Sequence, residues 1–166
     1  MPDVGARPLG PRAPQMDPFV IAEDDRVKVS AILVPHGPVF PAFAFRFDTD
    51  YGSVVFSGDT TYTDNIVTLA RDADVLVHEA INIAGAAGLT DAHRDHLIES
   101  HIEVQQAGPI AQRAGAKHLV LSHIADFVDN PINLGQWRKW AQRGYRGKVT
   151  VARDLDRVQV GARPKR

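Results

Sequence analysis

Hydrophobic and polar positions in the first half of the chain alternate with the period of β-strands. Residues 26–34 alternate and then become wholly apolar, as in a strand that enters a covered sheet. Two further strands are expected at residues 42–47 and 53–56, separated by a turn at residues 48–52. The first half therefore predicts a β-meander.

In the second half, segments with helical periodicity alternate with short apolar strands. We predict helices at 63–73, 103–114 and 134–143 and strands at 75–77, 118–121 and 148–152. Gly115 directly follows the second helix and is expected to be its C-cap. Trp137 and Trp140 lie three residues apart on the last helix, which indicates a packing stripe. The fold class is therefore α/β with layered packing.

The composition limits the kinds of site and partner. The chain has 166 residues, the size of one domain, and its 19 Lys and Arg nearly balance its 20 Asp and Glu, so no global charge recruits nucleic acid. It has no cysteine, so a metal must be held by His, Asp or Glu. No apolar run approaches the roughly 18 residues of a membrane span, and we expect a cytoplasmic protein without membrane contact.

Three of the predicted strands end in a residue able to bind a metal. His36 follows SAILVP, Asp59 follows SVVFSG, and His123 follows HLVLS. Strand ends place side chains at one edge of a sheet, where loops converge on a ligand. Each residue alone is a weak signal, because a single histidine after a strand is more often a surface residue than a ligand.

The contexts of these residues strengthen the prediction. VVFSGDT at 54–60, DADVLVHEA at 72–80 and GPIAQRAGAKHLVLSHI at 108–124 resemble the metallo-β-lactamase superfamily, in particular its ribonuclease Z and arylsulfatase-like branch. The resemblance covers residues 26–128. It implies an αββα sandwich and a hydrolase that uses two zinc ions.

The same resemblance implies roles for individual residues. Asp59 matches the carboxylate that bridges the two ions, His123 the late histidine ligand, and His36 the middle histidine ligand. His78-Glu79-Ala80 and Ser100-His101 resemble two ribonuclease Z motifs, in which the histidine corresponding to His101 donates a proton and the glutamate corresponding to Glu79 orients it. The alternative is that Glu79 caps a loop and His101 starts a helix.

One expected motif is missing. The superfamily signature His-x-His-x-Asp-His should lie upstream of His36, where the sequence has no histidine, so three of seven expected ligands remain. We therefore predict the C-terminal half of the domain at residues 18–166, after a disordered lead or linker remnant at residues 1–17. Whether this chain alone is an enzyme is left open, since it is truncated, split or degenerate. Asp91–His96 imitates the signature but is read as a solvated helix entry, and His118 as a surface histidine.

The predicted reaction is hydrolysis of a small-molecule ester: a phosphodiester, a sulfate ester or a lactone. Only 23 residues separate His36 from Asp59, which leaves no room for the protruding arm of ribonuclease Z enzymes, and no basic, aromatic stripe follows a phosphate backbone. A ribonuclease Z-like tRNA 3′-end endonuclease is one alternative. The other is a non-catalytic half-domain or gene remnant, whose exposed sheet face predicts association with a missing N-terminal half or a homo-oligomer.

Overall fold

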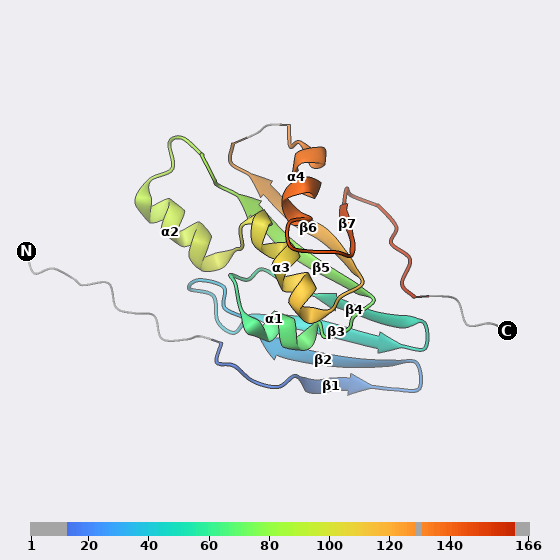
Figure 1. The fold of residues 1–166 in the computed structure, drawn as a ribbon. Helices are drawn as coiled ribbons and strands as arrows, with labels where there is room; N and C mark the ends of the chain where they lie inside the picture. The colour runs from blue at the N-terminus through green and yellow to red at the C-terminus, as the bar shows by residue number, and fades with distance from the viewer. Residues whose placement is uncertain (1–12, 129–130, 162–166) are drawn as a thin grey trace, which may run out of the picture.

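A single seven-stranded sheet organises the molecule (Figure 1). The computed structural model describes residues 13–128 and 131–161. The strands lie in chain order: β1 (Phe19–Glu23), β2 (Val27–Leu33), β3 (Phe43–Thr49), β4 (Gly52–Phe56), β5 (Val75–Asn82), β6 (His118–Asp126) and β7 (Lys148–Val151). The helices are α1 (Asp64–Leu69), α2 (Asp91–Ser100), α3 (Val104–Ala114) and α4 (Leu134–Ala141). The predicted α/β class is confirmed.

The strands are antiparallel in the first half of the sheet and parallel in the second. β1 to β4 form the predicted antiparallel meander, and β4 to β7 are parallel. Parallel neighbours need crossover connections of one hand, which places the connecting helices on one face. Accordingly α1 contacts β2 and β3, α3 contacts β5 and β6, and α4 contacts β7. These helices lie in front of the sheet in Figure 1.

The core lies between these helices and the sheet. Ile32, Leu76 and Leu119 from the strands and Ile110 and Trp137 from the helices are fully buried. Burying side chains of this size is worth about 1.5–3 kcal/mol each, so this layer is a major source of stability. Trp137 is thus a packing residue, as its spacing predicted.

The ends of the elements differ from the sequence prediction in several places. β5 and β6 each extend past the predicted apolar runs because polar residues such as Asn82 remain paired between the strands. α1 ends earlier than predicted, at Leu69. β1 was not predicted, since all five of its residues are exposed. α2 begins at Asp91, where a helix entry was expected, and Gly115 is the left-handed C-cap of α3.

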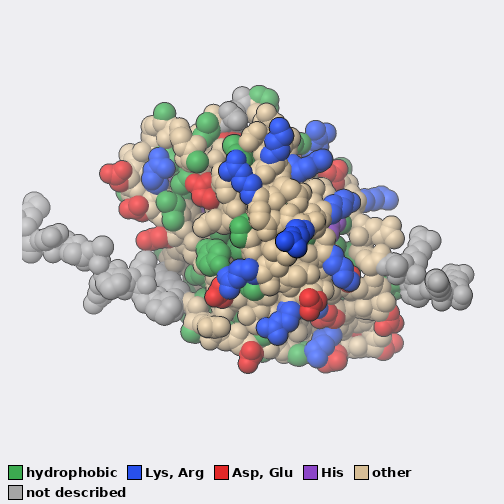
Figure 2. All heavy atoms as spheres, viewed as in Figure 1, with side chains coloured by type: hydrophobic (Ala, Val, Ile, Leu, Met, Phe, Trp, Pro, Cys, Tyr) green, Lys and Arg blue, Asp and Glu red, His purple; other side chains and the backbone are tan. Residues whose placement is uncertain are grey.

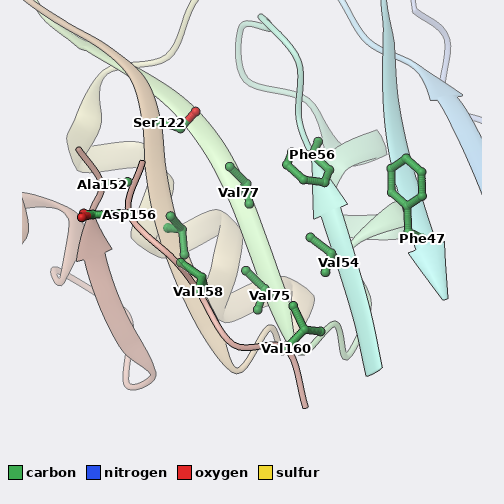
Figure 3. A pocket seen from close by; sticks show the side chains of 11 residues that line it. Phe47, Val54, Phe56, Val75, Val77, Ser122, Ala152, Asp156, Val158 and Val160 are labelled. Carbon is green, nitrogen blue, oxygen red and sulfur yellow. The ribbon is translucent and has the colours of Figure 1, made fainter. Parts of the chain in front are cut away.

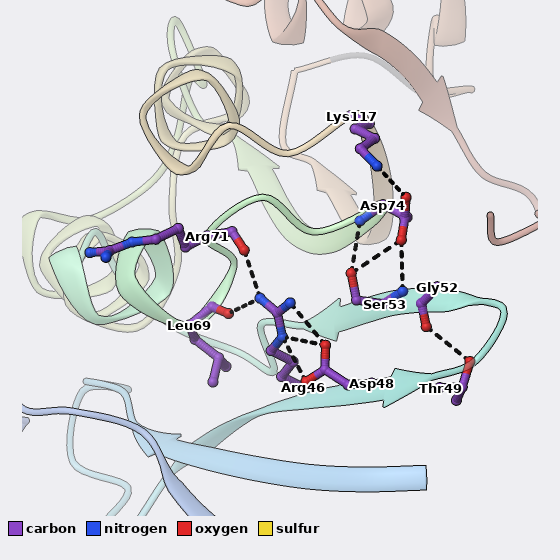
Figure 4. A network of polar contacts seen from close by, with 9 residues as sticks. All are labelled: Arg46, Asp48, Thr49, Gly52, Ser53, Leu69, Arg71, Asp74 and Lys117. Carbon is purple, nitrogen blue, oxygen red and sulfur yellow. Dashed lines mark hydrogen bonds and ion pairs between the residues drawn. The ribbon is translucent and has the colours of Figure 1, made fainter. Parts of the chain in front are cut away.

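Polar contacts fix the turns on the side of the sheet away from the candidate site (Figure 4). Arg46 pairs with Asp48 and donates to the main-chain carbonyls of Leu69 and Arg71, which satisfies the carbonyl end of α1. Asp74 accepts from the Ser53 amide and pairs with Lys117.

On the helix-covered face, Lys and Arg are spread among Asp and Glu (Figure 2). No helix of the described residues is long and apolar enough to cross a membrane.

The face of the sheet opposite the helices is apolar and largely open. A hollow of about 450 Å³ lies over it, lined by residues that include Val54, Phe56 and Val77. Val158 and Val160 of the C-terminal segment lean over one side of this hollow (Figure 3). Phe56 keeps 43% of its surface exposed beside this hollow, so it adds to a continuous apolar surface.

Of the predicted lead at residues 1–17, residues 1–12 lie outside the described part. Within the rest, the carbonyl of Pro14 and the amide of Met16 bond to the side chain of buried Asn65. The same Asn65 amide group donates to the carbonyl of Leu33 at the end of β2. Residues 14 and 16 are therefore tied to the first turn of α1.

Candidate metal centre

The candidate residues gather at one edge of the sheet. β2 and β4 each pair antiparallel with β3 and so run in the same direction as each other, while β5 and β6 are parallel to β4. The carboxyl ends of all four strands therefore meet at one edge. His36 and Asp59 follow β2 and β4, and Glu79 and His123 lie within β5 and β6. His101 reaches the same place from the link between α2 and α3.

His36 is held by the end of α2. Its Nδ1 donates to the main-chain carbonyl of Ser100 at 2.9 Å, so in the neutral ring Nε2 is the nitrogen whose lone pair can bind a cation. Gly37 approaches the same turn so closely that a Cβ there would lie 2.4 Å from Ser100 Oγ, and its φ is +45°. The Gly37 amide also donates to the carbonyl of Glu99. Glycine therefore allows the His36 loop to dock on α2.

Asp59, in the loop after β4, faces His123, which lies at an irregularity within β6. His123 Nε2 lies 3.4 Å from Asp59 Oδ2, and the two side chains are 63% and 39% exposed. Gly58, before Asp59, has φ +59°, and a Cβ there would lie 2.9 Å from the carbonyl oxygen of Phe43. His123 itself has φ +46°, a conformation that non-glycine residues adopt at a cost. Such strained positions often mark functional sites.

The structure brings all of these histidines around one carboxylate. Donor atoms of His36, Asp59 and His101 lie within 4.8 Å of one another. The His101 ring centroid is 5.2 Å from that of His36 and 5.9 Å from that of His123. Imidazole nitrogens and one carboxylate are a donor set that zinc accepts, so the residues present fit a zinc ion.

Glu79 lies behind His101 and organises the site. Its side chain is only 2% exposed, and its Oε1 accepts from the amides of Thr60 at 3.2 Å and Ile102 at 3.1 Å. The same oxygen faces His101 Nδ1 at 3.4 Å, longer than a usual hydrogen bond. Glu79 therefore does two things that the sequence analysis gave as alternatives. It binds main-chain amides of two loops, and it faces His101.

Burial perturbs both members of this pair in directions that favour neutral groups. It raises the pKa of Glu79 to about 8. It lowers the pKa of His101, an effect that the negative charge of Asp59 partly offsets. Near neutral pH the Glu79 carboxyl is therefore mostly protonated, while the His101 imidazole is neutral. With the pKa of Glu79 raised and that of His101 lowered, this proton is held by the Glu79 carboxyl, beside the His101 ring.

The other histidines lie outside this cluster or have structural partners. His93, in the segment that imitates the missing signature, is exposed on α2 and packs edge-on against Phe127 with ring centroids 6.2 Å apart. His118 Nε2 bonds to the hydroxyl of Thr150 at 2.9 Å. His78 is fully buried, and its Nδ1 donates to the Glu79 carbonyl. His118 is half-buried at the start of β6, away from the cluster, so the surface reading fits it only in part.

Sequence reasoning missed the main-chain partners of the site. The amides of Thr60 and Ile102 and the carbonyl of Ser100 carry no side-chain pattern that could have marked them. Ser57 was also missed, although its hydroxyl accepts from the Glu79 amide at 3.1 Å. Its place two residues before Asp59 was the only available signal.

Comparison with known proteins assigns the family. A family model described as "Beta-lactamase superfamily domain" matches residues 8–124. The chain belongs to the metallo-β-lactamase superfamily. The matched region ends one residue after His123 and includes every candidate site residue.

Several of the curated relatives that match are ribonucleases Z. Ribonuclease Z of Mycobacterium tuberculosis (strain H37Rv) is 34% identical over 139 residues, which is 84% of this chain and 50% of the relative. Ribonuclease Z of Mycobacterium avium (strain 104) is 37% identical over 141 residues, 83% of this chain and 50% of the relative. The chain thus spans about half the length of the curated relatives it matches.

Solved structures give the same assignment of fold. The metallo-β-lactamase fold protein YhfI from Bacillus subtilis superposes with a TM-score of 0.63 and 26% identity, over 82% of this chain and 48% of that one. The short form of human tRNase Z has a TM-score of 0.59 and 26% identity, over 88% and 47%. The chain therefore has the fold of one half of these proteins.

Proposed function

We propose that this chain is the C-terminal half of a ribonuclease Z-like, metal-dependent phosphodiesterase that acts on RNA. The observation that carries the proposal is the buried Glu79 carboxylate that faces His101, with His36, Asp59 and His123 gathered beside that ring. Identity of 34–37% to mycobacterial ribonucleases Z supports the nuclease over other hydrolases of the superfamily.

The metal would be held by His36, Asp59 and His123. The proximity of Asp59 to His123, 3.4 Å away, and to His36, whose donor atom lies within 4.8 Å, supports this assignment. Zinc bound there would polarise a phosphoryl oxygen and lower the pKa of a bound water toward neutrality. The chain's own contribution is to fix the donors. The Ser100 carbonyl sets the tautomer of His36, and the loop glycines Gly37 and Gly58 allow close approach of both loops.

His101 would protonate the leaving oxygen of the cleaved phosphodiester. The proton held by the buried Glu79 carboxyl near neutral pH could pass to His101 Nδ1 while Nε2 gives its proton to the leaving oxygen, as a general acid requires. Glu79 aligns the ring through Nδ1, and its bonds to Thr60 and Ile102 fix it between the Asp59 loop and the His101 turn. One side chain thus sets the distance between the metal ligands and the acid.

The proposed complete site needs a second segment of protein. Three ligands do not make the two-ion site that the resemblance implies, and this chain spans only half of its relatives. The groove at the cluster shares Phe56, Val77 and Ser122 with the hollow on the open sheet face. A partner layer that covers this apolar face would therefore also border the metal centre, where it could add ligands. Residues 18–166 alone are then expected to be inactive.

A small-molecule ester remains a second candidate substrate because one structural feature favours it. Between His36 and Asp59 the chain forms only β3, β4 and tight connections, with no protruding arm to hold a large RNA. The groove beside Asp59 and His123 has a volume of about 250 Å³, which suits a small ester. The identity to ribonucleases Z outweighs this feature, so the nuclease is the main proposal.

The test is cleavage of a 3′-extended tRNA transcript, with bis-p-nitrophenyl phosphate as the small ester, in the presence of zinc. The chain is assayed alone and together with the N-terminal half of the Mycobacterium tuberculosis ribonuclease Z. Complementation that cleaves the transcript and is lost in Asp59→Asn and His101→Gln supports the proposal, with His93→Ala as the unaffected control. Turnover of the small ester without cleavage of the transcript would favour the second candidate, and no association or turnover would favour a non-catalytic half-domain.

A further inference from the structure

His101 has the surroundings of a metal ligand as well as those of an acid. Histidines that bind metals usually donate their other ring N–H to a carboxylate or a carbonyl, which fixes the ring and its tautomer. His36 has this arrangement, with Nδ1 on the carbonyl of Ser100. His101 has a related but looser arrangement, in which Nδ1 faces the Glu79 carboxyl at 3.4 Å without a hydrogen bond, so that a small shift of either side chain would form one. In both residues Nε2 is the nitrogen left for a cation.

The distances allow His36, Asp59 and His101 to share an ion. Their donor atoms lie within 4.8 Å of one another. Zinc bonds of about 2.0–2.2 Å in tetrahedral geometry place donors about 3.3 Å apart. Side-chain adjustments of about an ångström would therefore close the site around one ion.

His101 is also better ordered for this role than His123. The side chain of His101 is 14% exposed and lies between Glu79 and the His36 ring, whereas His123 is 63% exposed. Immobilising an exposed side chain costs conformational entropy that a packed one has already lost on folding. An ion bound by this chain alone therefore gains more from His101 than from His123.

We propose that this chain, when it binds zinc without a complementary half, forms a mononuclear site in which His101 Nε2 is a ligand beside His36 and Asp59. The inference rests on the metal centre of the proposed function and adds a second state to it. A nitrogen bound to a metal carries no proton, so His101 cannot act as the acid in this state. Further ligands from a complementary half would release His101 to its catalytic role. The isolated half would thus bind metal and remain inactive.

The experiment is a zinc titration of the full 166-residue chain with ¹⁵N-labelled histidine, followed by long-range ¹H–¹⁵N NMR of the imidazole nitrogens. We expect the Nε2 signals of His36 and His101 to shift together and to saturate at one ion per chain. Zinc affinity is measured in parallel by competition with a chromophoric chelator. His101→Gln should weaken binding by at least about 10-fold, while His93→Gln, on the exposed surface of α2, should leave it unchanged.

Two further measurements separate a lost ligand from a damaged fold. The metal-free melting temperature of His101→Gln, followed by circular dichroism, should match that of the wild type. Glu79→Gln keeps an oxygen for the Thr60 and Ile102 amides but removes the carboxylate, and should weaken zinc binding by about 10-fold without changing the number of ions bound.

The outcomes distinguish this inference from the proposed function. Shifts at His36 and His123 with no shift at His101, or unchanged affinity in His101→Gln, would overturn the inference and leave the proposed metal centre intact. No zinc binding to the wild-type chain, with no histidine signal shifted, would overturn both. If the inference alone were overturned in this way, cleavage of the transcript by the complemented enzyme would still support the proposed nuclease.

Discussion

Truncation of Glu79 to alanine should destabilise the chain far more than its replacement by glutamine. Glu79 Oε1 is the acceptor for the buried amides of Thr60 and Ile102. Leaving a buried donor unsatisfied costs about 1–3 kcal/mol, so Glu79→Ala should lose about 2–6 kcal/mol of unfolding free energy. Glu79→Gln keeps a side-chain oxygen in place, and near neutral pH it replaces a largely neutral carboxyl by a neutral amide. We expect it to lose about 1 kcal/mol or less.

Urea unfolding followed by far-ultraviolet circular dichroism, in the presence of a chelator, measures both variants at pH 6. The pH dependence supplies a second readout. Burial raises the pKa of Glu79 from 4.5 to about 8, so its contribution to stability is fully present below pH 4.5 and is lost as the pH rises through 8. Glu79→Gln should remove this loss. A Glu79→Ala variant within 1 kcal/mol of the wild type, or a glutamine variant as unstable as the alanine one, would refute the proposed role of this side chain in holding the two loops together.

Three other perturbations test separate parts of the structure. Burial lowers the pKa of His78 from 6.5 to about 4, so its contribution is present above pH 6.5 and is lost as the pH falls through 4. Lowering the pH from 7.5 to 5 should reduce this contribution by about 2 kcal/mol. Because Glu79 titrates in the opposite sense over the same range, the loss is measured in urea titrations as the difference between Glu79→Gln and the same variant with His78→Leu. Gly108→Ala should lower stability by about 1–3 kcal/mol or more, because the added Cβ would lie 2.2 Å from the carbonyl of the last residue of α4; Gly135→Ala, which meets only an ordinary contact, is the control in thermal melts. Phe56→Ser should reduce binding of the dye ANS and self-association in sedimentation velocity with little loss of stability, and an unchanged dye signal would show that the open sheet face is not the exposed apolar surface.

The sequence indicated where the candidate residues lie on the sheet better than it indicated what holds them there. Apolar strands that end in His36, Asp59 and His123 could be placed at one sheet edge, because parallel strands must end together. The strand-end pattern also located the meander and the crossover helices. These features depend on local periodicity, which is visible in a single sequence and leaves few possible topologies.

Other features depend on tertiary contacts that leave no local signal. Glu79 binds amides 19 and 23 residues away in the chain, and any residue type could have supplied those amides. β1 has no buried face, so its residues carry no alternation that marks a strand. β5 continues through His78, Glu79 and Asn82 because its main chain stays paired with β6, although these residues are polar and buried, which hydrophobicity alone does not predict.

The substrate was the least predictable feature. The short interval between His36 and Asp59 pointed to a small ester, whereas the relatives at 34–37% identity are ribonucleases Z. Loop length describes only how much chain surrounds the site. It does not describe which surface of a complete protein holds the rest of the substrate.

Zinc titration calorimetry of the wild-type chain and of Asp59→Asn tests the central claim, that the cluster at the sheet edge is a metal centre, most directly. Asp59 is the carboxylate that both the His36–His101 group and His123 approach, and the asparagine keeps its size while removing its charge. The account predicts one tightly bound ion in the wild type and at least about 10-fold weaker binding in the variant. Equal affinities for the two proteins, or no binding by the wild type, would contradict it.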